Sequence, residues 1–534
     1  MIRIEEIVIS PDGSESRIPS VIASILNIKS KEILSFKIAK RAIDSRNKSR
    51  VNFVFTVDFE VASDEILLKS LAQEHAAFKR HRLRIYEAFV YNIPFSAPSL
   101  DEKSPVIVGS GPCGLFAALY LARAGRNPLI IERGKAVEER IKDVDMFMMG
   151  GALNPESNIQ FGEGGAGTFS DGKLYTLVND PRTAFIFETL VKAGAPHEIL
   201  VSAKPHVGTD KLRLLLKNLR TEIIRLGGRF LFETRLDDLI IENDCLSGII
   251  VNENQEILTN RLVLATGHSA RDTFAMLHRR GLHMEQKIFS MGLRIEHPRT
   301  FINQAQYGKF ASHPALGAAP YKLAVQLTGG RSAYSFCMCP GGMVVPGASE
   351  PGYLVTNGMS EYAQDAENSN SALLVNVGPK DFGSNHPLAG VEYQRKYEKL
   401  AFELGGRDYH VPVQRVADFM NARPTKQLGK VLPSYKPGYR LTELSLCLPA
   451  HISKTLHDAL PLFDARIRGF MMDDAVLSGV ESRSSSPLRI LRNTEYQSNI
   501  RGVYPAGEGA GYAGGIVSSA LDGLRIAEAM ITNT

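Results

Sequence analysis

Three glycines at the spacing G-x-G-x-x-G form the most specific chemical signal in this sequence. Gly109, Gly111 and Gly114 follow the apolar run VIV and lead into the apolar stretch LFAALYLARA. In a strand–turn–helix unit of this kind, the second glycine lets the backbone approach a pyrophosphate, and Pro112 suits the first helical turn. Glu132 ends the next apolar run, 18 residues after Gly114 and close to the ~20 expected for an acid that binds a ribose. The pattern predicts a dinucleotide site, with the pyrophosphate at the N-terminus of the helix.

Two distant segments add further residues to this site. Residues 260–273, NRLVLATGHSARDT, follow a predicted β-meander and read as a strand that ends in Ala-Thr-Gly. Thr266 and Gly267 would then pass close to the cofactor. Arg133, which directly follows Glu132, is counted with the cofactor-binding residues.

The second segment lies near the C-terminus, where GVYPAGE reads as a late strand that ends in Gly507 and Glu508. An acid at this place can bind a ribitol hydroxyl. The helix predicted from GGIVSSALDGLRIAEAM begins near Gly514, Gly515 and Ile516. Its N-terminus can face the flavin edge on which negative charge collects during reduction. The two segments favour FAD over NAD.

The loop FGEGGAGTFSDGKLYT, residues 161–176, has five glycines and no strand–helix framing. Such a loop can run across a flavin, where backbone N–H groups reach its N5 or O4 atom. The alternative is a Gly-rich surface turn. The flavin interpretation assigns cofactor contacts to Gly164, Gly165, Gly167, Thr168 and Ser170.

Catalytic candidates are few, and no base can be named. Lys173 follows the glycine loop, and Arg483 and Arg489 lie in ESRSSSPLRI, just before the closing strand. Guanidinium groups fit carboxylates, so the two arginines suit an acidic substrate. The alternative for them is a connector held by salt bridges. No spacing of His, Cys, Asp or Glu indicates a metal site.

Cys337 and Cys339 in SFCMCPGG are two residues apart, so on an extended strand both thiols face one side. Such a pair beside a flavin could pass electrons onward through a mixed disulfide. Cysteine is also among the most readily buried residues and packs as a small hydrophobe. We expect the packing role.

The glycine fingerprint, the Ala-Thr-Gly segment and the closing GVYPAGE strand resemble the glutathione-reductase-type flavoprotein superfamily. More narrowly, the sequence is similar to bacterial FAD-dependent dehydrogenases through FGEGGAGTFSDGKL, SFCMCPGGMVVP, NARPTKQLGKVLPSY and GVESRSSSPLRI. The resemblance implies non-covalent FAD and hydride transfer between a small-molecule substrate and flavin N5. It brings no substrate identity. Glu508 stands where the wider superfamily usually has Asp.

The element pattern predicts an α/β protein with a bipartite Rossmann-like FAD domain. Residues 101–284 form its first part and 471–534 its closing part. Residues 285–470, with short β runs between Gly and Pro turns, form an inserted β-rich substrate domain. Residues 1–100 form an N-terminal α+β domain whose order β-α-β-β-α-β suggests a ferredoxin-like sandwich. There is no sign of a second Rossmann unit, so NAD(P)H is expected only as a transient substrate, and electrons can also pass to a partner protein.

The 534 residues include five cysteines and carry a formal net charge of +5. No apolar run approaches the ~20 residues needed to span a bilayer, and no signal peptide is visible. We expect a reduced, cytoplasmic protein. The alternative function is a flavin-containing protein that modifies nucleic acid or binds RNA and docks through the basic N-terminal domain. A solvated basic face is favoured over this, because the aromatic residues of RNA-recognition domains are not in their usual pattern. The basic residues are Lys29, Lys31, Lys37, Lys40, Arg41, Arg46, Lys48, Arg50, Lys79, Arg80, Arg82 and Arg84.

Overall fold

The N-terminal part of the chain forms an antiparallel sheet with one described helix on it. The computed structural model describes residues 1–62, 81–95 and 103–532. The sheet order is β2-β3-β1-β4, from β1 (Ile2–Ile9), β2 (Ile33–Asp44), β3 (Asn52–Val61) and β4 (Arg84–Ile85). The helix α1 (Ile18–Leu26) and alternate residues of β3 share one apolar core. The second helix expected over residues 64–80 lies outside the described residues.

The strand predicted over residues 84–93 is regular only at its beginning, in β4. Tyr91 and Ile93, farther along, pack on the apolar core of the next domain instead. Contacts with that core therefore replace the pairing expected within the N-terminal sheet.

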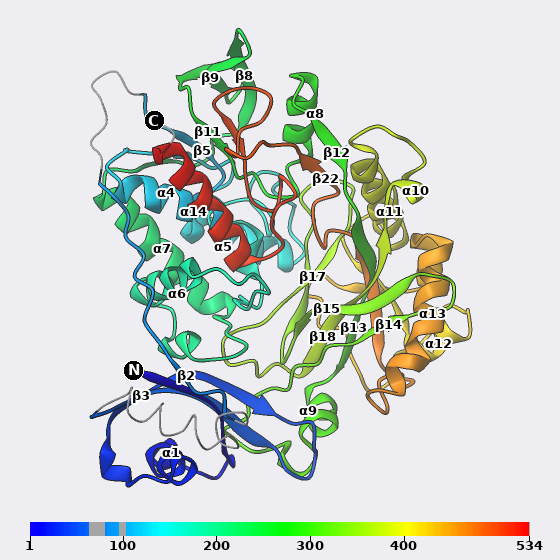
Figure 1. Ribbon diagram of the computed structural model, residues 1–534. Coiled ribbons are helices and arrows are strands. Elements are labelled where there is room, and N and C mark those ends of the chain that lie inside the picture. Colours follow the sequence, from blue (N-terminus) through cyan, green and yellow to red (C-terminus); the bar gives the residue numbers. More distant parts are fainter. Residues whose placement is uncertain (63–80, 96–102, 533–534) are drawn as a thin grey trace.

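A five-stranded parallel sheet forms the centre of the second region (Figure 1). Its order is β23-β11-β5-β6-β7, from β5 (Val106–Val108), β6 (Leu129–Ile131), β7 (Arg229–Leu231), β11 (Leu262–Leu264) and β23 (Val503–Pro505). The central strands are buried at every position, as expected for a parallel sheet covered on both faces. The direction of strand order reverses between β5 and β11. In such sheets, ligands bind at the carboxyl ends of the strands beside this switch point.

Helices cover one face of the parallel sheet, and a small antiparallel meander contributes to the other. The meander consists of β8 (Leu236–Glu242), β9 (Cys245–Val251) and β10 (Gln255–Leu258), and it shares a core with α8 (Arg271–Arg279). On the helical side, Gly523 lets α14 approach α4, because a Cβ there would lie 2.1 Å from the Cys113 carbonyl oxygen. The helices here are α4 (Pro112–Arg123), α5 (Val137–Met148), α6 (Arg182–Lys192), α7 (Thr209–Arg225) and α14 (Ile516–Thr532).

A seven-stranded sheet forms the third region, in the order β14-β15-β18-β13-β21-β19-β20. Its neighbouring strands are antiparallel except for β19 and β20. The strands are β13 (Phe289–Pro298), β14 (Ala324–Gln326), β15 (Ser332–Cys339), β18 (Asn368–Val377), β19 (Val411–Arg415), β20 (Tyr439–Leu441) and β21 (Val476–Glu481). This sheet extends beyond residue 470, the predicted end of the inserted domain, because β21 pairs with both β13 and β19.

Shorter elements complete this region and join it to the parallel sheet. β12 (Met284–Gln286) pairs with β22 (Leu488–Ile490), so the chain enters and leaves the seven-stranded sheet side by side. The hairpin of β16 (Met343–Pro346) and β17 (Thr356–Met359) lies beside it. The helices are α9 (Arg299–Tyr307), α10 (Pro379–Phe382), α11 (Ala389–Leu404), α12 (Val416–Met420) and α13 (Ala450–Asp464).

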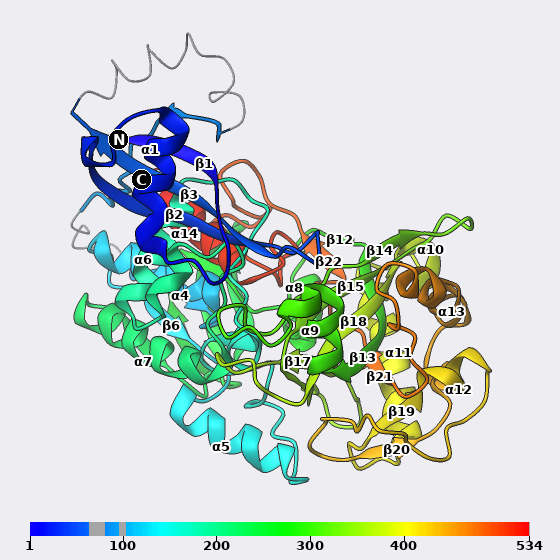
Figure 2. The ribbon, with the colours of Figure 1, turned by 90° about the horizontal axis from the view of Figure 1, so that it is seen from below.

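The N-terminal sheet lies against the other two regions, as Figures 1 and 2 show from two sides. The backbone of Arg41 in β2 forms a bridge with the segment near Ser202: its N–H donates to the Val201 carbonyl at 2.6 Å, and its carbonyl accepts from Ala203 at 2.8 Å. Lys48 donates to the Gln306 carbonyl at 2.7 Å. The N-terminal domain is therefore docked by backbone hydrogen bonds of Arg41 and by the Lys48 side chain.

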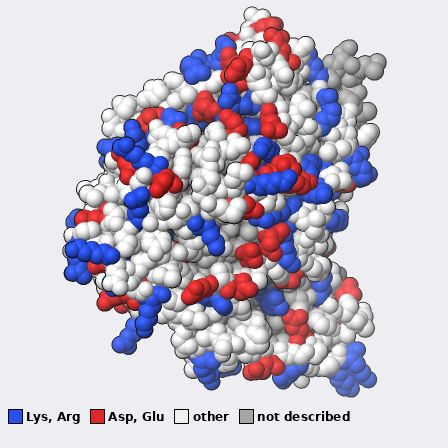
Figure 3. Space-filling model, turned by 180° about the vertical axis from the view of Figure 1, so that it is seen from behind, with Lys and Arg blue, Asp and Glu red and all other residues white. Residues whose placement is uncertain are grey.

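Charge is mixed on the face shown in Figure 3, where Lys and Arg side chains are interspersed with Asp and Glu. In the part of the chain that the structure describes, no helix has both the length and the apolar character needed to cross a membrane.

Candidate functional site

A cavity of about 1280 Å³ opens at the carboxyl ends of β5 and β11. This volume exceeds the ~300–1,000 Å³ of usual small-molecule pockets. Its lining comes from all three regions, including Gly109 of the glycine turn, Cys337 of the seven-stranded sheet and Arg41 of the N-terminal sheet. The cavity therefore has room for an extended ligand.

The glycine turn after β5 has the geometry that its spacing predicts. Gly109 has φ +100°, and a Cβ there would lie 2.3 Å from the Ala265 carbonyl oxygen. A Cβ on Gly114 would lie 1.9 Å from the Gly109 carbonyl oxygen, so this glycine serves helix–strand packing and does not line the cavity. Gly111 and Pro112, which begin α4, do line it.

Glu132 is buried at the end of β6, and its carboxylate accepts four hydrogen bonds from the chain. Ser110 donates its N–H and hydroxyl at 3.0 and 2.8 Å, and the N–H groups of Gly134 and Gly162 donate at 2.9 and 3.0 Å. The carboxylate lines the cavity and also fixes the loops around it.

Arg133 faces the same end of the cavity and is already engaged with acids. It pairs with Glu156 at 2.7 Å and Asp272 at 2.9 Å, and its guanidinium lies 4.1 Å from the centre of the Phe161 ring. Burial and these two acids act on the pKa of Arg133 in opposite senses, and the pKa is raised overall. Arg133 therefore holds the cavity wall as a permanent cation.

The glycine loop takes its shape from Arg140, a residue that sequence reasoning missed. Arg140 is fully buried in α5, and burial lowers its pKa to about 10. Its guanidinium donates to four carbonyls at 2.6 to 3.1 Å: those of Gly162 and Glu163 in the loop, and those of Asn158 and Ile159 just before it. Nothing distinguishes this arginine from the surface arginines of other helices in the sequence.

The loop presents only part of the predicted contact set to the cavity. Gly165, Gly167 and Ser170 line it. Gly164 does not, and Thr168 is buried with its hydroxyl donating to the Glu163 carbonyl at 3.0 Å. The loop therefore turns one side to the cavity and the other to Arg140.

Thr266, Gly267 and Glu508 also line the cavity, and Thr266 lies directly beside the glycine turn. His268 joins them, with Nδ1 3.4 Å from a Glu508 carboxylate oxygen. Its Nε2 is buried and has no hydrogen-bond partner among the described residues. A buried polar atom of this kind is expected to meet a ligand or water.

The closing segment is held by Asp522 of α14, another residue that the sequence did not single out. Asp522 accepts from the Gly507 N–H at 2.7 Å and pairs with Arg492 at 2.7 Å. Gly507 itself lies behind the cavity wall. The start of α14 faces the cavity with Gly514, Gly515 and Ile516.

Lys173 lies in the cavity beside an acid and two thiols. Its ammonium is 3.2 Å from Asp171 and 3.7 Å from the Cys339 sulfur. Burial lowers the pKa of Lys173, but Asp171 and the thiols outweigh it, and the pKa is raised overall. The residue is therefore a fixed cation and not a base near neutral pH.

The cysteine pair departs from the expected extended geometry. Cys337 has φ +44°, and the register of β15 shifts between Phe336 and Cys339. Cys339 is fully buried, while Cys337 lines the cavity. The neighbouring thiol of Cys339, then Lys173 and Arg294, lower the pKa of the Cys337 thiol.

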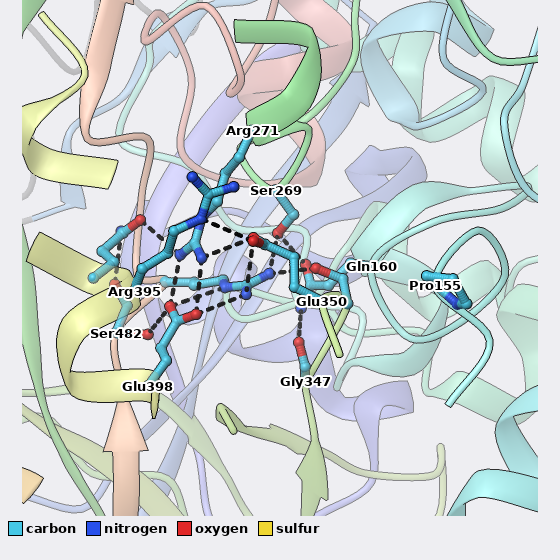
Figure 4. Close-up of polar contacts among 12 residues, drawn as sticks. Pro155, Gln160, Ser269, Arg271, Gly347, Glu350, Arg395, Glu398 and Ser482 are labelled. Atoms are coloured by element: carbon cyan, nitrogen blue, oxygen red, sulfur yellow. Dashed lines mark hydrogen bonds and ion pairs between the residues drawn. The ribbon is translucent and has the colours of Figure 1, made fainter. Parts of the chain in front are cut away.

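Arg483 reaches the cavity but belongs to a buried ionic network. Arg271 and Arg483 both bind Glu398, at 2.6 and 2.9 Å. Figure 4 shows Glu350 facing Arg271 and Arg395, to which it is joined at 2.9 and 2.8 Å. The network joins α8 of the parallel-sheet region to α11 beside the seven-stranded sheet.

Arg489 does not line the cavity. It lies on β22, 41% exposed, with Glu285 at 3.8 Å and its guanidinium 5.2 Å from the centre of the Tyr512 ring. These surroundings agree with the alternative given for Arg489, a connector held by salt bridges.

The fold is a parallel sheet of the nucleotide-binding type, joined to an antiparallel sheet. The antiparallel sheet closes one side of the cavity. Residues 288–484 match the family described as "FAD-dependent protein, C-terminal domain-like", and residues 1–60 match one described as a domain of unknown function. An "Uncharacterized protein" of Clostridium beijerinckii is 46% identical over 532 residues, 99% of this chain and 98% of that protein. The chain belongs to the same family as this clostridial protein, and the family match supports FAD as the cofactor.

Other similarities cover a smaller part of the chain or have a lower sequence identity. "Thiamine thiazole synthase" of Aeropyrum pernix is 28% identical over 147 residues, 28% of this chain and 43% of that protein. The quinol fumarate reductase subunit FrdA of E. coli gives a TM-score of 0.34 at 13% identity, covering 81% of this chain and 71% of that one. L-proline dehydrogenase from P. horikoshii gives 0.32 at 13%, covering 82% and 95%.

Proposed function

We propose that this protein is an FAD-dependent oxidoreductase that moves a hydride between a small-molecule substrate and the flavin. The observation that carries the proposal is the cavity at the switch point of the parallel sheet, with a dinucleotide turn at its edge. Membership of the glutathione-reductase-type superfamily and non-covalent attachment of FAD are part of the proposal.

The residues around the cavity fit FAD. The backbones of Gly111 and Gly165 lie close together at the cavity: a Cβ on Gly165 would be 3.3 Å from the Gly111 Cα. Because neither residue has a side chain, both backbones stay accessible to a ligand. The start of α4 can receive the pyrophosphate, and the start of α14 at Gly514 and Gly515 can receive the flavin edge. His268 supplies the buried, unpartnered ring nitrogen described above. Bound FAD would supply the hydride acceptor at N5, and the chain would supply position and electrostatics.

Lys173 is proposed to polarise and orient the substrate. Its ammonium is held by Asp171, which itself accepts from Ser360 and, at 3.0 Å, from Gln364. A cation fixed in this way can stabilise negative charge that develops on a substrate oxygen. Arg483 is proposed to act through position only, since its guanidinium already binds Glu398, Ser269 and Ser349.

The test is cofactor release followed by reduction. The purified protein is expected to be yellow and to release FAD, and not FMN, on denaturation. In an anaerobic titration with a panel of small metabolites, compounds of one chemical class should then reduce the bound flavin and bleach its absorbance. Lys173→Met should slow bleaching at least tenfold without loss of bound FAD, and Lys192→Met, on the exposed end of α6, is the matched control. A colourless protein that takes up no FAD would contradict the proposal.

Nucleic-acid docking receives less support than a small-molecule substrate. Among the basic residues of the N-terminal domain, Arg41 is 3.3 Å from Glu15 and Arg46 is 2.7 Å from Asp44. The backbone of Arg41 is also bonded to the FAD-binding region. Salt-dependent RNA binding would favour the alternative.

A further inference from the structure

Two lysines face each other at the rim of the cavity, far from Lys173 in the chain. Lys204 follows the segment that bonds to β2, and Lys322 lies two residues before β14. Both line the cavity, and both are exposed. Neither ammonium has an ion pair or hydrogen bond among the contacts of the described residues. Partial burial of the side chain, and then the neighbouring Lys322 ammonium, lower the pKa of Lys204.

Nearby acids balance only part of the positive charge of the rim. Arg41 adds a third cation, and its partner Glu15 is 3.3 Å away. Glu198 is the acid of the same rim. Two like charges that approach without a counter-ion repel each other, so the folded chain gains from an anion placed between them. The unpaired lysines are thus arranged for an anionic group of a ligand.

Exposed apolar side chains lie on the same part of the cavity lining. Leu177 is 97% exposed and Tyr175 is 53% exposed, and both follow Lys173 along the chain. Ile43 of β2 and Phe336 of β15 are 38% and 36% exposed and also line the cavity. Surface apolar residues gathered at a cavity mark a ligand or partner site, whereas single ones need no explanation.

We propose that the substrate is a small organic anion with an apolar body, whose carboxylate or phosphate binds Lys204 and Lys322. This inference rests on the proposed function and names its substrate class. The anionic group stays at the rim, while the apolar body reaches inward past Tyr175 and Phe336 toward Lys173. The N-terminal domain takes part in the site, because Arg41 and Ile43 of β2 form one side of the rim. Lys173 differs from the rim lysines, because its ammonium already has an ion-pair partner, Asp171, at 3.2 Å.

The proposal is tested with two probes that differ by one charged group. The anionic probe is 1-anilinonaphthalene-8-sulfonate, and the neutral one is N-phenyl-1-naphthylamine, which has the same aromatic body without the sulfonate. Equilibrium dialysis of each against the FAD-loaded protein gives the dissociation constants. The double variant Lys204→Gln with Lys322→Gln removes the charge pair, and Lys192→Gln removes a cavity-distant lysine as the matched control.

The double variant is expected to bind the anionic probe at least tenfold more weakly and the neutral probe with unchanged affinity. Lys192→Gln should change neither. The inference is overturned if the double variant keeps its affinity for the sulfonate, or if it loses affinity for both probes alike. It is also overturned if the bleaching compounds found with the metabolite panel are uncharged. The probe assay does not depend on flavin reduction. If no compound of the metabolite panel reduced the bound flavin, the proposed function would fail, while the charge dependence of probe binding would still be measured.

Discussion

Glu132 is the single residue on which the cofactor end of the cavity depends most. Its carboxylate holds the glycine turn at Ser110 and the glycine loop at Gly162. Glu132→Gln replaces one carboxylate oxygen with an amide NH₂ group. This group cannot accept the hydrogen bonds that the backbone N–H groups donated to the oxygen. Hydrogen bonds to a charged group are worth about 1.5–3 kcal/mol each, so FAD retention is expected to fall by roughly tenfold or more. FAD retention is measured by flavin absorbance after dialysis, and Glu256→Gln, at an exposed position, is the control. Full FAD occupancy in Glu132→Gln would show that the carboxylate is not needed.

The Cys337 thiol provides a second residue-scale prediction. Because the Cys339 thiol, Lys173 and Arg294 lower its pKa, the thiolate is populated at lower pH than in an ordinary cysteine. Iodoacetamide at pH 7 should modify Cys337 before the buried Cys113 and Cys447, whose pKa values are raised by burial, that of Cys447 to about 12. Lys173→Met should slow this reaction, while Lys192→Met leaves it unchanged. Peptide mass mapping over time measures the order, and first modification at Cys447 would contradict the prediction.

At the scale of the element, β13 contains a buried histidine near its end that makes the stability of the fold sensitive to acid. His297 donates from Nε2 to the Phe470 carbonyl at 2.7 Å, and burial lowers its pKa from 6.5 to about 4. Below pH 6.5 the unfolded chain binds a proton that the folded chain refuses, so stability falls as pH drops from 6.5 toward 4. Thermal midpoints should therefore decline more steeply in this window for the parent than for His297→Gln. Exposed His457→Gln should keep the parent slope, and equal slopes for His297→Gln and the parent would refute the assignment.

The elements that sequence patterns predicted are those fixed by local rules. Gly109, Pro112 and the apolar runs around them determine a turn, a helix start and buried strands within about thirty residues. Arg140, Asp522 and the pair of Arg271 with Glu398 could not be predicted, because their partners lie in other elements and their residue types are ordinary at helix positions. The bulge at Cys337 was missed for a related reason: it depends on the pairing of β15 with β18, which the sequence does not show.

At the scale of the whole molecule, the described residues contain one five-stranded parallel sheet, and the larger sheet beside it is mainly antiparallel. A dedicated NAD(P)H domain usually needs a second parallel sheet with its own glycine turn. The cavity instead opens to the N-terminal sheet and the rim lysines. Stopped-flow mixing with NADH or NADPH should therefore reduce the bound flavin slowly and with weak saturation, compared with the anionic donor identified by bleaching. The donor serves as the control on the same preparation. Reduction by either nucleotide at tens per second, saturating at micromolar concentration, would mean that the large cavity also contains a specific nicotinamide site.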